Sequence, residues 1–119
     1  MAHFQKLKVW EKAHALMVQT HGVVKRMKRT YDKSLCAQMN RAAESIAANI
    51  VEGKGKSSDA EFARFLRFAL GSAHELEYHF IAARDIEAIP ADAAAPLIAQ
   101  VIEVRRMIYG LLKRLEGGK

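Results

Sequence analysis

Apolar residues recur at alternating three- and four-residue steps along nearly the whole chain, and this spacing is typical of amphipathic helices. No stretch alternates apolar and polar residues with a period of two, so no strand is expected. Short connections oblige helices that follow one another to run antiparallel. The pattern therefore predicts an all-α, antiparallel up-down-up-down four-helix bundle that forms a single domain over residues 1–119. The predicted helices are residues 5–27, residues 34–52, residues 58–87, and a fourth that begins between Pro90 and Pro96 and ends near Leu115.

One apolar column in each predicted helix is the candidate core. Most members are aliphatic or aromatic, whereas Asn49 places an amide where the pattern calls for a hydrocarbon. In chain order the columns are Trp10, Ala13, Met17, Thr20, Val24 and Met27; Leu35, Met39, Ala42, Ile46 and Asn49; Phe62, Leu66, Ala69, Ala73, Leu76, Phe80 and Ala83; and Leu97, Val101, Val104, Ile108, Leu111 and Leu115.

Residues at the predicted helix ends support these boundaries. Ser34 is a plausible N-cap of the second helix, and Gly53 suits the left-handed position that ends it. Ser58 followed by Glu61 matches the capping box that opens a helix. Pro96 is compatible with a helix only in or near its first turn.

A stripe of polar residues borders the core of the second and third helices. Its members are Arg41, Ser45, Asn49, Ser72 and Glu75. A buried polar group without a partner costs about 1–3 kcal/mol. We therefore interpret the stripe as a hydrogen-bonded network that fixes helix pairing, in preference to a ligand site.

The third helix carries more large apolar residues than one core column requires. The additional residues are Phe65, Phe68, Tyr78 and Ile81. They predict a second buried face, and hence an oligomer interface. The alternative is that a wide core stripe absorbs them.

The 119-residue chain has a formal net charge of +6, which points toward a polyanionic partner such as RNA or DNA. Cations cluster toward both ends of the predicted bundle. We predict contact with phosphates rather than base-specific recognition. The candidate nucleic-acid-binding residues are Lys25, Arg26, Lys28, Arg29, Lys54 and Lys56.

The expected cellular location rests on three features of the sequence. The single cysteine, Cys36, cannot form an intrachain disulfide, and residues 1–10 lack the apolar segment of a signal peptide. No apolar run approaches the length that spans a membrane. A cytoplasmic protein without membrane association is the expectation.

No arrangement of residues suggests catalysis. Glu75 and His79 are four residues apart, whereas the Glu-to-His spacing of di-iron bundles is three, and no matching set occurs on the first or fourth helix. His14 and His21 are too far apart along one helix to share a metal ion. We therefore expect no catalytic residues, no bound metal, no cofactor and no enzymatic activity.

Three groups of residues resemble one bacterial family. The first is Phe4, Leu7, Val9, Trp10 and Ala13; the second is Arg41-Ala42-Ala43, Ser45-Ile46, Asn49-Ile50 and Glu52-Gly53; and the third is Phe62, Phe65-Leu66, Ala69, Gly71-Ser72, Glu75 and Glu77. The chain resembles, from Phe4 to about Leu115, the four-helix-bundle proteins encoded in intervening sequences of bacterial large-subunit rRNA genes. A related protein is the accessory variability determinant of diversity-generating retroelements.

This resemblance implies an up-down bundle that assembles into a homopentameric ring, with no established catalytic activity. For the retroelement relative it implies a basic surface that contacts nucleic acid and a reverse transcriptase. The leading hypothesis is a non-enzymatic oligomeric scaffold or adaptor that binds nucleic acid without sequence preference. The alternative is a protein-protein interaction module with no nucleic-acid role.

Overall fold

The computed structural model describes residues 4–27 and 33–117. A short 3₁₀ turn, η1 (Phe4–Lys6), precedes the first of four long α-helices. The helices are α1 (Lys8–Arg26), α2 (Lys33–Lys54), α3 (Asp59–Asp85) and α4 (Ala91–Gly117).

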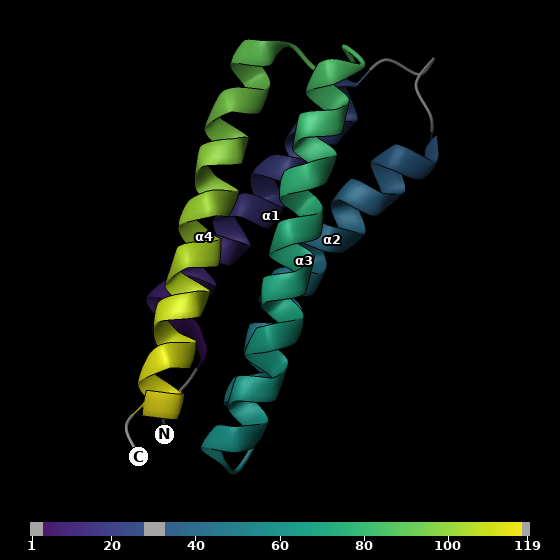
Figure 1. The fold of residues 1–119 in the computed structure, drawn as a ribbon. Coiled ribbons are helices and arrows are strands. Elements are labelled where there is room, and N and C mark those ends of the chain that lie inside the picture. Colours follow the sequence, from purple (N-terminus) through teal and green to yellow (C-terminus); the bar gives the residue numbers. More distant parts are fainter. Residues whose placement is uncertain (1–3, 28–32, 118–119) are drawn as a thin grey trace.

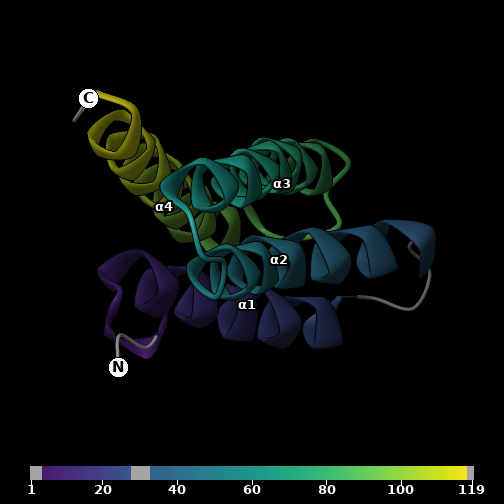
Figure 2. The same cartoon turned by 90° about the horizontal axis from the view of Figure 1, so that it is seen from below.

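The helices form the predicted antiparallel bundle, which measures 50 × 21 × 20 Å (Figure 1). Each helix packs against two others in the cyclic order α1, α2, α3, α4, and the diagonal pairs make no contact within the described residues. Seen along its length, the bundle has one layer of α1 and α2 and another of α3 and α4 (Figure 2). The start of α1, the α2–α3 turn and the end of α4 lie at one end of the bundle (Figure 1).

The predicted core column of α3 is confirmed, because all seven of its members are buried. The other columns are confirmed in part. Their buried members are Ala13, Thr20, Met27, Met39, Ala42, Ile46, Leu97, Val101, Val104 and Ile108, and their remaining members are partly buried. In α1 the buried column contains Leu16, while Met17 is only partly buried, and in α4 Leu112 replaces Leu111. Neighbouring apolar residues make two adjacent columns equally apolar, so the periodicity alone does not choose between them.

The ends of α3 follow known capping rules. Ser58 is the N-cap, and its Oγ accepts a hydrogen bond from the Glu61 amide at 3.1 Å, as predicted. At the other end, Glu87 has a φ of 64°, and the Ala88 amide donates to the Ala83 carbonyl at 2.8 Å. This is the Schellman arrangement with a non-glycine residue in the left-handed position.

One predicted boundary is off by one residue, and another is confirmed. Ser34 lies inside α2, which begins at Lys33 among the described residues. Helix α4 begins at Ala91, between Pro90 and Pro96 as predicted, and Pro96 lies in its second turn. The loss of one backbone donor at this early position is compatible with a continuous helix.

Gly53 does not have the predicted role of a left-handed terminal residue. The helix continues to Lys54, and no described glycine has a positive φ. Gly53 is buried, and a Cβ atom placed on it would lie 2.8 Å from the Phe65 Cβ and 3.3 Å from the Phe62 carbonyl oxygen. Its missing side chain allows α2 and α3 to approach closely at their shared turn.

Candidate nucleic-acid interface

Cations from several segments gather at the end of the bundle that contains the α2–α3 turn. We call this group the basic end. None of its members forms an ion pair with another described residue; the described Lys and Arg ion pairs involve other cations. The basic end comprises Lys6, Lys8, Lys54, Lys56, Lys113 and Arg114.

The opposite end of the bundle also carries predicted binding residues. Lys25 and Arg26 are exposed in the last turn of α1. Lys28 and Arg29 lie outside the described residues. The two candidate groups therefore lie toward opposite ends of the bundle.

Three phenylalanines of α3 lie beneath cations from the region of the α2–α3 turn and from α3 itself. The Lys54 Nζ lies 5.6 Å from the centroid of the Phe62 ring, and the Lys56 Nζ lies 5.1 Å from that of Phe65. The Arg64 guanidinium carbon lies 4.9 Å from the Phe65 centroid and 5.4 Å from the Phe68 centroid. All four distances are within the range of cation–π attraction.

This arrangement joins two groups of residues that the sequence assigned to different surfaces. We call Lys54, Lys56, Arg64, Phe65 and Phe68 the aromatic–basic patch. The Phe65 and Phe68 rings meet edge to face with centroids 5.6 Å apart, and Phe68 is 48% exposed. Arg64, Phe65 and Phe68 all lie on α3, and Lys54 and Lys56 join them only when the turn packs beside that helix.

The other two predicted interface residues lie apart from this patch. Tyr78 is 65% exposed, and Ile81 is half-buried. Ten residues separate Phe68 from Tyr78, which corresponds to about 15 Å along a helix. The four predicted residues therefore do not form one continuous apolar stripe.

Part of the predicted polar network joins α2 to α3. The Ser45 and Ser72 hydroxyl oxygens are 2.8 Å apart and share a hydrogen bond between the helices. The Asn49 Nδ2 donates to the Ser45 Oγ at 3.0 Å and to the Ser45 carbonyl at 2.8 Å. The Asn49 amide is thus satisfied at the margin of the core.

The structure excludes Arg41 and Glu75 from this network. Arg41 is exposed, on the side of α2 away from the buried column, and no hydrogen bond joins it to Ser45, Ser72 or Glu75. The Glu75 carboxylate instead pairs with the Nε2 of the buried His79 at 3.1 Å. The interaction of Arg41 with Ser72 or Glu75 that the spacing suggested is therefore absent.

We expect Ser45→Ala and Ser72→Ala each to lower the free energy of unfolding by about 1 kcal/mol, because each leaves a half-buried hydroxyl without its partner across the helices. The double variant should lose less than the sum of the two, because both changes remove the same hydrogen bond. Denaturant titration measures all three values. Arg41→Ala is the control, with an expected change below about 0.5 kcal/mol. Additive effects of the two serine changes would contradict the coupling.

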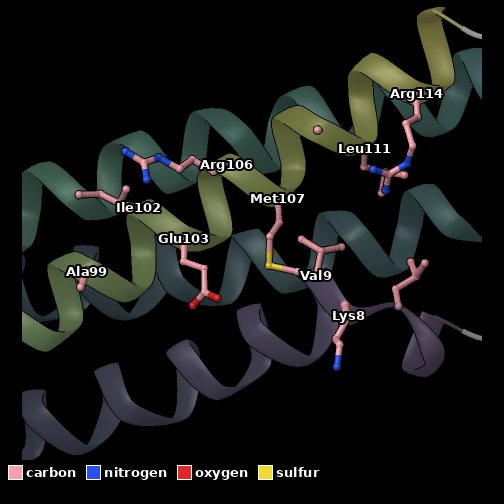
Figure 3. A pocket seen from close by; sticks show the side chains of 11 residues that line it. Lys8, Val9, Ala99, Ile102, Glu103, Arg106, Met107, Leu111 and Arg114 are labelled. Carbon is pink, nitrogen blue, oxygen red and sulfur yellow. The ribbon is translucent and has the colours of Figure 1, made fainter.

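A groove of about 530 Å³ runs between the start of α1 and the stretch of α4 from Ala99 to Arg114 (Figure 3). Its walls combine Val9, Met107 and Leu111 with the charged residues Glu103 and Arg106. The Met107 side chain points toward Val9, and Glu103 points toward α1, where Lys12 pairs with it at 3.7 Å. The sequence pattern gave no indication of this groove, because it depends on how far α4 diverges from α1.

The described residues contain no group of three or more His, Cys, Asp or Glu side chains able to hold a metal ion. Among them, too, no helix is long and apolar enough to cross a membrane.

Comparison with known proteins gives one family and one fold. The model of the family described as "23S rRNA-intervening sequence protein" matches residues 5–110. A crystal structure of a protein of unknown function from the S23 ribosomal protein family of Bacteroides thetaiotaomicron superposes with a TM-score of 0.83. That protein is 24% identical in sequence, and the superposition covers 88% of this chain and 98% of the other. No curated protein matches the chain.

Proposed function

Because the chain belongs to the family of 23S rRNA-intervening sequence proteins, we propose that it is a non-enzymatic oligomeric adaptor that binds RNA or DNA through its basic surfaces. The observation that carries the proposal is the basic end, where η1, α1, the end of α2 with its turn, and α4 together contribute six cations that form no ion pair with another described residue. A surface of this kind attracts phosphates through counterion release, with little dependence on sequence.

The basic end has a stronger claim to this role than the opposite end. Four separate segments contribute to it, and Lys54 and Lys56 are held over aromatic rings rather than neutralised by carboxylates. At the opposite end, Lys25 and Arg26 remain secondary candidates. We propose that the bound partner is nucleic acid, with an enzyme that acts on it, such as a reverse transcriptase, as a further partner.

Self-association is the second part of the proposal, and we propose a homopentameric ring. Support comes from the family resemblance and from large apolar side chains that are exposed in the single chain, including Tyr78, Ile86 and Tyr109. Such groups favour burial against another copy. We assign Tyr78 and Ile81 to this contact. Phe65 and Phe68 fit it poorly, because a second copy placed there would have to bury the adjacent cations of Arg64 and Lys56.

A ring would also strengthen binding, because several weakly binding basic ends on one particle act together on a single strand. The lone cysteine is compatible with a cytoplasmic location, which we propose for this adaptor. A protein-interaction module without a nucleic-acid role remains the alternative, and the experiments below distinguish the two.

We expect light scattering during gel filtration to give a mass about five times the 13.3 kDa of the single chain. Tyr78→Asp should shift the mass toward the monomer while helical circular dichroism is retained, because a carboxylate is costly to bury in an apolar contact. A short labelled oligonucleotide should co-elute with the wild-type oligomer. A wild-type mass of one chain would refute the oligomer, and absence of co-elution at low salt would favour the protein-only module.

A further inference from the structure

We propose that the aromatic–basic patch is a stacking site for unpaired bases, so that the chain prefers single-stranded RNA or DNA to a duplex. This inference deepens the proposed function and rests on it. The proposed function requires only phosphate contact. The patch adds an aromatic surface beside the lysines that would contact phosphates, at the same end of the bundle.

The exposed aromatic surface is the first part of the argument. Phe68 is 48% exposed although it is a large apolar side chain in the middle of a stable helix. It lies against Phe65, whose ring is perpendicular to it at an angle of 89°. A base has two flat π faces, and stacking one on an aromatic side chain tolerates any sequence.

The Arg64 guanidinium is the second part. The Arg64 Nε and Nη2 donate to the two Glu61 carboxylate oxygens at 3.3 and 3.4 Å. The same guanidinium lies over the Phe65 and Phe68 rings. Its opposite face is a second flat surface on which a base can stack, as arginine planes do in RNA complexes.

The two lysines beside the aromatic rings are the third part, because they can contact phosphates. Lys56 lies over Phe65, and Lys54 lies over Phe62 one helical turn away, so ammonium groups border the rings on the side of the α2–α3 turn. A strand whose base rests on Phe68 can therefore place its phosphates against these lysines. A duplex offers the same phosphates, but its bases are already stacked on one another. The combination thus selects unpaired nucleic acid.

The decisive comparison uses fluorescence anisotropy with four probes of equal length. They are single-stranded RNA, single-stranded DNA, the DNA duplex, and a DNA strand made of abasic units. The abasic strand keeps the phosphates and removes the bases. Wild-type protein should bind both base-bearing single strands about tenfold more tightly than the abasic strand, since one stacked base is worth about this factor.

Substitutions at Phe68 separate stacking from general apolar contact. Phe68→Leu keeps an apolar side chain but removes the π face, so it should abolish the tenfold preference and leave abasic binding unchanged. Phe68→Trp should retain the preference, and base stacking should quench the fluorescence of the added indole. Both variants should keep the wild-type oligomeric mass, which light scattering checks.

Other results of these measurements would overturn either the stacking site or the proposed function. Equal affinity of wild type for base-bearing and abasic strands would overturn the stacking site while leaving the proposed phosphate binding intact. A preference that survives Phe68→Leu, or an oligomer that dissociates in that variant, would also overturn it, the latter in favour of a contact between copies. Failure of wild type to bind any probe would instead refute the proposed function on which the inference rests.

Discussion

Gly53→Val is expected to lower the free energy of unfolding by about 3 kcal/mol, because there is no space for a side chain where α2 meets α3. A Cβ atom there would lie 2.8 Å from the Phe65 Cβ and 3.0 Å from the Phe62 Cδ1. The Phe65 Cβ is fixed to the backbone of α3, so rotation of a side chain cannot relieve the clash. The helices themselves would have to separate. Denaturant titration at one fixed protein concentration measures the loss, because the stability of an oligomer depends on concentration.

Gly71→Val is the matched control. Gly71 also lies inside a helix, but nothing is within 4 Å of the position that its Cβ would take. Valine has a slightly higher helix propensity than glycine, so the expected change is below about 0.5 kcal/mol and favourable. Equal effects of the two substitutions would show that Gly53 is not a site of close approach.

Combined Lys54→Glu and Lys56→Glu substitutions are expected to weaken binding of a single-stranded probe about 100-fold. Both positions belong to the basic end, so each reversal replaces attraction to phosphate with repulsion, and repeated copies in an oligomer multiply the effect. Fluorescence anisotropy at constant ionic strength measures the affinity. Circular dichroism and light scattering should show that helix content and oligomeric mass are unchanged.

Combined Lys25→Glu and Arg26→Glu substitutions are the control at the other end of the bundle. Both double variants change the formal charge of +6 by the same amount, so a difference between them reports location rather than overall charge. We expect the control to weaken binding less than tenfold. A larger loss in the control would move the contact to the opposite end and contradict the assignment to the basic end.

Local sequence signals predicted the fold well. The regular column from Phe62 to Ala83 and the Ser58 cap depend only on neighbouring residues in one helix, and the structure confirms both. Antiparallel packing followed from the short connections. A prediction was wrong where one residue in the sequence suits two different structural roles. A glycine after Glu52 suits both a helix end and a close helix contact, and only the position of Phe65 in space distinguishes them.

The candidate site was less predictable, because its parts come from different elements. Arg41 was assigned to a polar stripe that borders the predicted core column with Asn49. The buried face of α2 extends beyond that column to Ala43 and Ile50, whereas Asn49 lies at its margin and Arg41 is exposed. The aromatic–basic patch joins Lys56 of the turn to Arg64 and Phe68 of α3. Helical spacing relates Arg64 to Phe68, but no spacing rule places Lys56 beside them before the turn has folded.

The most direct test of the central claim is the affinity of the wild-type chain for a labelled single strand as the salt concentration is varied. We expect clear binding at low salt, and a linear decrease in the logarithm of the association constant with the logarithm of salt concentration. The slope should correspond to several released counterions. Absence of binding at the lowest salt, or an affinity that does not change with salt, would contradict nucleic-acid binding through the basic end.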